Sequence, residues 1–207
     1  MDAINYPLIL GAALIAIPSP GPATLAIAGA SMASGRRIGM ALGAGVVCGS
    51  LTWSTSAAFG LSAIMLAHVW MFEAVRYAGA AYLIYLSIVS ARSACFGKGK
   101  KASPVEISSM GAAFRKGLAI HLTNPKAILF FGSLYSIGVP AGATAGDLVS
   151  IIAAVGSLSA FIMIGYGWLF SIASVRQAYI RLHRWFSGLF ALAFGAIGFK
   201  LLTTRLV

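Results

Sequence analysis

The sequence predicts an all-α integral membrane protein with six transmembrane helices. Hydrophobic residues make up 59% of the 207 residues and charged residues only 9%, whereas soluble domains carry about 25% charged residues. Apolar stretches long enough to cross a hydrocarbon core of ~30 Å recur six times, at residues 5–30, 38–67, 72–91, 117–138, 147–172 and 185–204. We therefore expect one transmembrane domain over residues 1–207, with residues 92–113 as a cytoplasmic loop between the third and fourth helices.

The lysines and arginines are distributed unevenly between the predicted connections. Those on one side are Arg36, Arg37, Arg92, Lys98, Lys100, Lys101, Arg115, Lys116, Arg176, Arg181 and Arg184, and those on the other are Arg76, Lys200 and Arg205. By the positive-inside rule, the richer side faces the cytoplasm and both chain termini lie outside the inner membrane. Topology and contact with membrane lipids then explain the net charge of +11, which does not indicate nucleic-acid binding.

The first apolar segment contains a predicted break at residues 17–23, IPSPGPA. Pro18, Pro20 and Pro22 each lack an N–H and disfavour helix at the preceding residue, so a straight helix cannot pass through. In hydrocarbon, the freed carbonyl groups need partners inside the protein or in a wet cavity. Transporters use such discontinuous helices to build their substrate sites.

The second segment carries glycines at helical spacing. Gly35, Gly39 and Gly43 recur every four residues, and Gly45 and Gly49 repeat the interval. Small-residue faces of this kind let helices approach closely. They suit either the interior of the bundle or a homodimer seam, and we expect the interior because the second helix has to pack against the broken first one.

The fourth segment carries a second predicted break, at Asn124-Pro125-Lys126. At 1.5 Å per residue, Lys126 lies about 15 Å from Lys116 and about 18 Å from Gly138, which is near the bilayer midplane. Pro20 falls at a similar depth in the first segment. Breaks in the first and fourth of six helices are typical of a 3+3 inverted repeat with the site between its halves; the alternative is two proline kinks that serve packing alone.

Lys126 is the residue that most strongly indicates a site. A charge near the bilayer centre costs at least about 2.5 kcal/mol, and no acidic residue of the sequence lies at that depth. We expect a substrate carboxylate, held by the half-helix N-termini after the two breaks, to be the missing anion. The alternative is that the ammonium reaches carbonyl groups freed at the first break, such as those of Leu14 or Ala16.

No motif for catalysis, metal binding or redox chemistry is present. Cys48 and Cys95 form no C-x-x-C pair, and neither paired acids nor a nucleophile with a nearby base stand at one depth. We therefore expect neither an enzyme nor a cofactor or metal site. Trp70 and Trp185 flank apolar segments and are expected to anchor them at the membrane interface.

In their order along the chain, Pro20-Gly21-Pro22, then Gly35-Arg36-Arg37, and then Asn124-Pro125-Lys126-Ala127 resemble the LysE/RhtB family of amino-acid exporters. The resemblance covers essentially the whole chain. It implies a secondary transporter that exports amino acids or small derivatives, commonly by proton-coupled exchange. Together with the two breaks, it gives as candidate substrate-binding residues Pro18, Pro20, Gly21, Pro22, Thr24, Ser50, Asn124, Pro125 and Lys126.

Three positions depart from the family pattern and mark this chain as a divergent member. Ala23, Ser50 and His121 stand where the family usually has Asn, Asp and Asn. Because no acidic residue then remains at mid-membrane, His121 is the candidate proton carrier, since imidazole titrates between about pH 5 and 8. The alternative is a neutral histidine that hydrogen-bonds freed backbone.

The absence of acidic residues at mid-membrane also favours neutral amino acids over cationic substrates or divalent metals, which prefer oxygen anions. Two alternatives to amino-acid export remain. One is an exporter of another small solute or ion, and the other is a non-transporting membrane assembly or sensor protein on the same fold.

Overall fold

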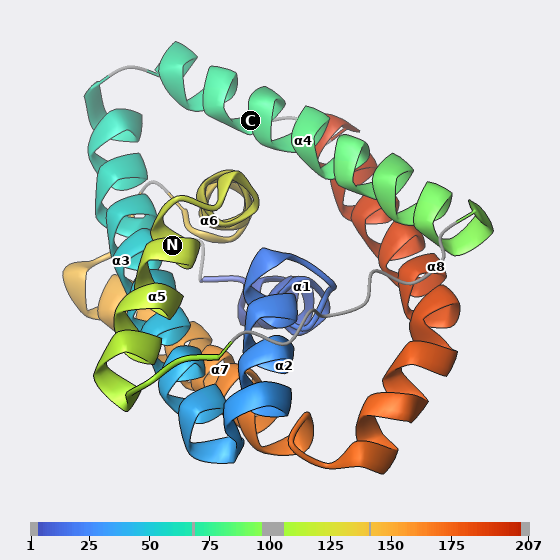
Figure 1. The fold of residues 1–207 in the computed structure, drawn as a ribbon. Coiled ribbons are helices and arrows are strands. Elements are labelled where there is room, and N and C mark those ends of the chain that lie inside the picture. The colour runs from blue at the N-terminus through green and yellow to red at the C-terminus, as the bar shows by residue number, and fades with distance from the viewer. Residues whose placement is uncertain (1–3, 68, 97–105, 141, 204–207) are drawn as a thin grey trace.

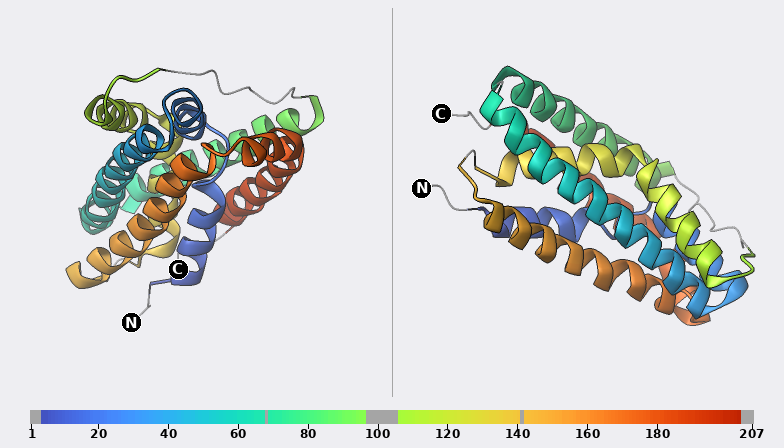
Figure 2. Two further views of the ribbon diagram at one scale, coloured as in Figure 1. Left: turned by 60° about the horizontal axis from the view of Figure 1, so that its bottom comes forward. Right: turned by 90° about the vertical axis from the view of Figure 1, so that its left-hand side faces the viewer.

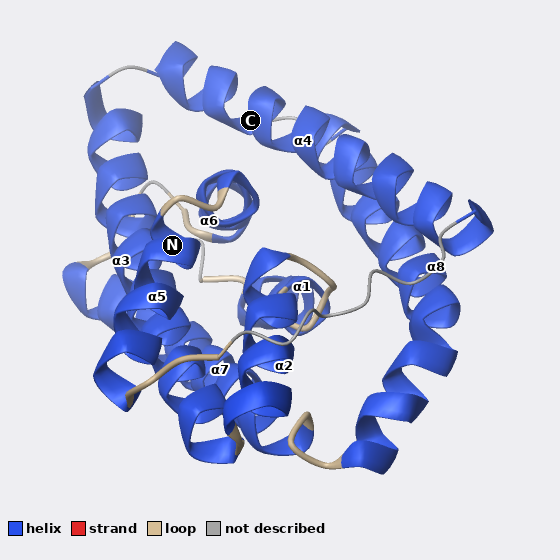
Figure 3. Ribbon diagram, viewed as in Figure 1, coloured by secondary structure: helices blue, strands red, loops and turns tan. Residues whose placement is uncertain are grey.

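The computed structural model describes residues 4–67, 69–96, 106–140 and 142–203. Within these ranges every regular element is an α-helix (Figure 3). The helices are α1 (Tyr6–Ala16), α2 (Pro22–Ser34), α3 (Arg36–Ala67), α4 (Val69–Phe96), α5 (Met110–Leu122), α6 (Pro125–Gly138), α7 (Ala145–Leu169) and α8 (Ala173–Thr203). Helices α4 and α5 take up both ends of the expected loop 92–113, and residues 97–105 lie outside the described part.

In the described part of the chain, three helical stretches are long and apolar enough to cross a membrane: Arg36–Gly60, Tyr77–Phe96 and Ala145–Leu169. A fourth is obtained if Ala173–Tyr179 and Arg184–Lys200, bent by 57°, are counted as one span. Helices α1, α2, α5 and α6 have only 11 to 14 residues each, fewer than the ~20 that a span needs. The chain is thus an all-helical membrane protein with three or four such helices, and the count of six spans stays a prediction.

Both predicted helix breaks are confirmed. Helix α1 ends at Ala16 and α2 begins at Pro22, and α5 ends at Leu122 before α6 begins at Pro125. Both second halves start with proline, whose missing N–H costs nothing in the first turn. The residue before Pro125 is extended, with φ −83° and ψ 108°, as the steric effect of proline on its predecessor requires.

The helices form two groups (Figure 1). Helices α3, α5 and α7 pack together and against α2, while α4 and α8 lie side by side as a separate layer. Helix α4 contacts α6, and α8 contacts α1. Helices α1 and α6 therefore lie between the two groups, and each is joined through a break to a helix of the first group, α2 or α5, which places both breaks in the interior.

The connections that carry basic residues share one end of the bundle (Figure 2). The α2–α3 junction, the start of α5 and the α7–α8 junction lie together there, and the start of α1 lies at the other end. A single residue, Gly35, joins α2 to α3 and has φ 82°, a left-handed conformation that favours glycine. The grouping agrees with the charge pattern, while the orientation in a membrane stays a prediction.

Four of the predicted packing glycines, Gly39, Gly43, Gly45 and Gly49 of α3, serve the bundle interior, whereas Gly35 in the linker has no neighbour within 4 Å of an added Cβ. A Cβ added at Gly43 would lie 2.5 Å from the Met163 carbonyl oxygen of α7, and one at Gly49 would lie 2.8 Å from the His121 Cβ. Gly45 and Gly117 bring α3 and α5 into similarly close backbone contact. Close approach through these glycines holds α5 and α7 against α3.

Candidate functional site

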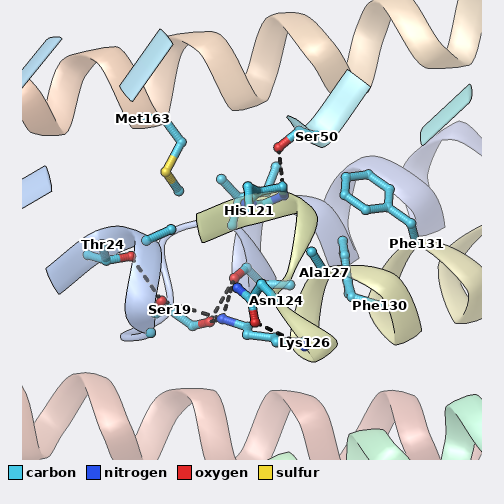
Figure 4. A pocket seen from close by; sticks show the side chains of 14 residues that line it. Ser19, Thr24, Ser50, His121, Asn124, Lys126, Ala127, Phe130, Phe131 and Met163 are labelled. Carbon is cyan, nitrogen blue, oxygen red and sulfur yellow. Dashed lines mark hydrogen bonds between the residues drawn. The ribbon is translucent and has the colours of Figure 1, made fainter. Parts of the chain in front are cut away.

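The two breaks meet at a cavity of about 40 Å³ in the protein interior (Figure 4). Its lining consists of Ala16, Ile17, Ser19, Gly21, Ala23, Thr24, Ser50, His121, Asn124, Lys126, Ala127, Phe130, Phe131 and Met163. The volume is close to the ~30 Å³ share of one water molecule in the liquid. The site is therefore contracted, and an amino acid needs more room than it offers.

Six of the predicted site residues line this cavity: Gly21, Thr24, Ser50, His121, Asn124 and Lys126. The predicted prolines do not. Pro18 borders a separate cavity of about 510 Å³, Pro20 and Pro22 border one of about 230 Å³, and Pro125 is the first residue of α6. The prolines thus shape the breaks, and the residues between and after them provide the surface of the site.

The Lys126 ammonium crosses from α6 to the end of α1. It donates to the Ala16 carbonyl at 3.2 Å, to the Ser19 carbonyl at 3.4 Å and to the Ser19 hydroxyl. The Phe194 ring of α8 lies 5.8 Å from the ammonium, within the range of a cation–π interaction. A cation is favourable at the C-terminal end of a helix. In this structure the lysine therefore bonds freed carbonyl groups, as the alternative interpretation expected. The carbonyl is that of Ala16 and not that of Leu14.

Other carbonyls at the first break, those of Pro18 and Ser19, also have hydrogen-bond partners inside the protein. The Ala16 carbonyl accepts a second bond from the Ser19 hydroxyl at 2.7 Å, and the Ser19 carbonyl accepts from Thr24 Oγ1 at 3.3 Å. The Tyr166 hydroxyl of α7 donates to the Pro18 carbonyl at 3.1 Å. This is the internal compensation that a break in hydrocarbon requires.

The N-termini of α2 and α6 differ in how they are capped. Asn124 Oδ1 accepts from the Lys126 backbone N–H at 3.0 Å and so caps α6. Helix α2 has no side-chain cap, and its N-cap residue Gly21 is extended. A Cβ placed on Gly21 would lie 3.9 Å from Lys126 Nζ. Two N-termini were predicted to bind an anion. The N-terminus of α2 is the better candidate, because it lacks a side-chain cap and lies near the Lys126 ammonium, whereas that of α6 is capped by Asn124.

His121 belongs to a hydrogen-bonded chain that joins three helices. Its Nε2 lies 3.1 Å from Ser50 Oγ of α3, and the Ser159 hydroxyl of α7 donates to Ser50 Oγ at 3.1 Å. The Nδ1 atom is buried and has no hydrogen-bond partner within the described part of the chain. The histidine therefore bonds a side-chain hydroxyl, and not the freed backbone of the alternative interpretation.

One side of the cavity is apolar and was not predicted. Ala127, Phe130 and Phe131 project from α6, and Met163 projects from α7. Phe130 follows Lys126 by four residues, so helical spacing alone places this one of the three α6 residues on its face. Met163 and the polar contributors Ser19 and Tyr166 carry no sequence signal, because tertiary packing brings them to the break.

Metal-binding groups and paired cysteines are not found within the described residues. No three His, Cys, Asp or Glu side chains of that part of the chain are arranged to hold a metal ion. Cys48 and Cys95 are both exposed and free. The chemistry of the central cavity is therefore that of one ammonium, one imidazole, hydroxyl groups and a helix N-terminus.

Residues 14–205 match the family of LysE type translocators. The threonine efflux protein of Escherichia coli (strain K12) is 30% identical over 200 residues, which cover 93% of this chain and 94% of that protein. The leucine efflux protein of Salmonella choleraesuis (strain SC-B67) is 33% identical over 132 residues, 64% of this chain and 62% of that protein. No solved structure gives a significant match. The chain therefore belongs to the LysE type translocator family, a family of membrane translocators and not of enzymes, as the resemblance of its motifs predicted.

Proposed function

We propose that this protein is a secondary transporter that exports a neutral amino acid across the cytoplasmic membrane, and that it binds the substrate between the two helix breaks. The observation that carries the proposal is the placement of Lys126. Its ammonium lies at the meeting point of the two breaks and is bonded only to oxygen atoms of Ala16 and Ser19 among the described residues. A mid-membrane cation held this way is available to a substrate anion.

The substrate carboxylate binds at the start of α2 in this proposal. There it meets the uncapped N–H groups that follow Gly21 and the adjacent Lys126 ammonium, an arrangement that favours an anion on both counts. To accept the carboxylate, Lys126 exchanges its bonds to Ala16 and Ser19 for bonds to the substrate. The Ala16 carbonyl still accepts from the Ser19 hydroxyl, and the Ser19 carbonyl still accepts from the Thr24 hydroxyl. The exchange therefore leaves neither carbonyl without a hydrogen bond.

The apolar side of the cavity supports a neutral substrate. Phe130, Phe131 and Met163 line the same space as Lys126, and the described lining holds no Asp or Glu to balance a cationic side chain. The relatives named above are efflux proteins for threonine and leucine, both of which are neutral amino acids. We therefore propose the same substrate class and the same direction of transport for this chain.

We further propose six spans arranged as a 3+3 inverted repeat, with both termini outside the cytoplasm. The repeat exchanges α1 with α5, α2 with α6, α3 with α7 and α4 with α8. Under this exchange the contact of α1 with α6 becomes that of α2 with α5, and both contacts occur. The pairs α3–α7 and α4–α8 map onto themselves and also pack together. Such a repeat places the site between its halves.

His121 is proposed as the proton carrier that couples export to the proton gradient. It lines the cavity, its Nε2 is linked through Ser50 to Ser159, and its Nδ1 is unpartnered within the described part. Lys126 is the other ionisable side chain in the same described lining. Protonation of either group changes the charge of the cavity that binds the zwitterion. The affinity for the substrate therefore depends on whether a proton is bound, and the binding of the proton depends in turn on the substrate.

The proposal is tested in proteoliposomes by efflux of labelled threonine, leucine and other amino acids, with and without an imposed pH gradient. Lys126→Met keeps the length and apolar stem of the side chain and removes its charge, and we expect it to reduce efflux at least tenfold. Lys116→Met is the matched control, because Lys116 is exposed on α5, and it should leave efflux unchanged. Movement of no amino acid by the parent protein, or equal efflux by the two variants, would refute the proposal.

A further inference from the structure

A second cavity, with three serines in its lining, lies on the other side of the first break. It has a volume of about 230 Å³ and is lined by Pro20, Gly21, Pro22, Leu25, Val89, Ser90, Ser93 and Ser187. Gly21 also lines the central cavity. The extended backbone at this glycine, which has no side chain to fill either space, therefore borders both cavities.

The lining of this second cavity suits a hydrated polar solute. Ser90 and Ser93 come from α4 and Ser187 from α8, and the Ser187 hydroxyl donates to the Ser93 hydroxyl at 3.5 Å. The larger cavity beside Pro18 differs, because aliphatic and aromatic side chains make up nearly all of its surface. Hydroxyl groups can replace part of the hydration shell of a zwitterion, whereas an apolar wall cannot.

The two halves of the proposed repeat pack differently, and the second cavity lies where one of the expected close helix contacts is missing from the described part of the chain. Helix α4 packs against α6, whereas α2 packs closely only against α3, α5 and α7. Under the proposed repeat, which exchanges α6 with α2 and α4 with α8, the counterpart of the α4–α6 contact is a contact between α8 and α2. The second cavity occupies that place, because its lining comes from the start of α2 together with α4 and α8.

Two of the lining serines lie toward the end of the bundle that carries the basic connections. Ser93 lies in the last turn of α4, and Ser187 follows Arg184, whose Nε donates to the Ala94 carbonyl at 2.8 Å. This is the end of the bundle where α2 joins α3 and α7 joins α8 (Figure 2). In the proposed orientation it faces the cytoplasm.

We infer that this serine-lined cavity is the cytoplasmic access chamber of the transporter, through which a neutral amino acid reaches the central site past Gly21. The inference rests on the proposed function and adds the route and its lining. The chamber binds the solute weakly through hydroxyl groups, and the stronger anion site at Lys126 lies directly beyond the glycine. Polar substrate is thus drawn from the chamber into the centre.

The chamber is tested by the reactivity of single cysteines in inside-out and right-side-out membrane vesicles. In a full-length background with Cys48→Ser and Cys95→Ser, Ser90→Cys places a thiol in the chamber. Ala91→Cys is the matched control, since Ala91 is an exposed neighbour on α4 that does not line the chamber. With a charged, membrane-impermeant methanethiosulfonate, we expect Ser90→Cys to react at least tenfold faster than Ala91→Cys in inside-out vesicles, and excess threonine or leucine to slow it.

Reactivity and efflux are measured on the same vesicles, so the two proposals fail separately. Fast labelling of Ser90→Cys without efflux of any amino acid would leave the chamber standing and overturn the transport function. Efflux with equal labelling of the two cysteines, or faster labelling of Ser90→Cys from the outside, would overturn the chamber. Should Ser90→Cys fail to insert, Val89→Cys probes the same lining with the same expected outcome.

Discussion

The contact between α3 and α7 at Gly43 gives the sharpest prediction for stability. A Cβ added by Gly43→Ala would lie 2.5 Å from the Met163 carbonyl oxygen and 3.0 Å from its carbonyl carbon, whereas ordinary contact begins at 3.4 Å. Both atoms belong to the backbone, so no change of rotamer relieves the clash, and the helices have to separate by about 0.9 Å at this point. Overpacking of this kind costs about 1–3 kcal/mol.

The matched control is Gly60→Ala on the same helix, where an added Cβ has nothing within 4 Å. Both substitutions gain the same helix propensity, about 1 kcal/mol, so the difference between the variants isolates the clash. For a chain of this size we expect the Tm of Gly43→Ala to fall below that of Gly60→Ala by roughly 2–12 °C. The assay is thermal unfolding of the purified protein in detergent, and equal Tm values would show that α3 and α7 do not meet at Gly43.

Two further predictions concern the second break and the proposed coupling. Asn124→Ala removes the hydrogen bond that caps α6 and should lower the free energy of unfolding by about 1 kcal/mol, seen as a lower Tm in detergent; Asn124→Asp keeps an acceptor oxygen, and an equal fall in both variants would contradict the capping role. His121→Asn should flatten the dependence of efflux on pH, because an asparagine side chain cannot take up a proton as imidazole does; efflux is measured in proteoliposomes at a fixed substrate gradient. An unchanged profile would exclude His121 as the proton carrier.

The breaks were predictable because they follow from local covalent chemistry, while the depth of Lys126 in the bilayer stays a prediction. Proline removes a donor wherever it stands, whereas the depth rests on counting residues along a helix. The same local reasoning named the Ala16 carbonyl as an alternative acceptor for Lys126, although a substrate carboxylate was the favoured partner. Only the folded chain supplies the second acceptor residue, Ser19.

The sequence did not indicate which residues from distant helices would complete the site. Tyr166 reaches the first break from 148 positions away along the chain, and Met163 arrives on the same helix. Their place depends on the close approach of α7 to α3 through Gly43, which is a tertiary property.

The single-residue linker at Gly35 constrains how this molecule can change shape. With one residue between α2 and α3, the two helices have almost no slack and are joined as a stiff hairpin, whose inner face is locked further by α5 and α7. A rearrangement that closes the serine-lined cavity thus carries the α4–α8 layer toward α2 and α3, instead of swinging α2 outward. The mobile arm of this transporter is, on that reasoning, the pair of helices that contributes least to the central site.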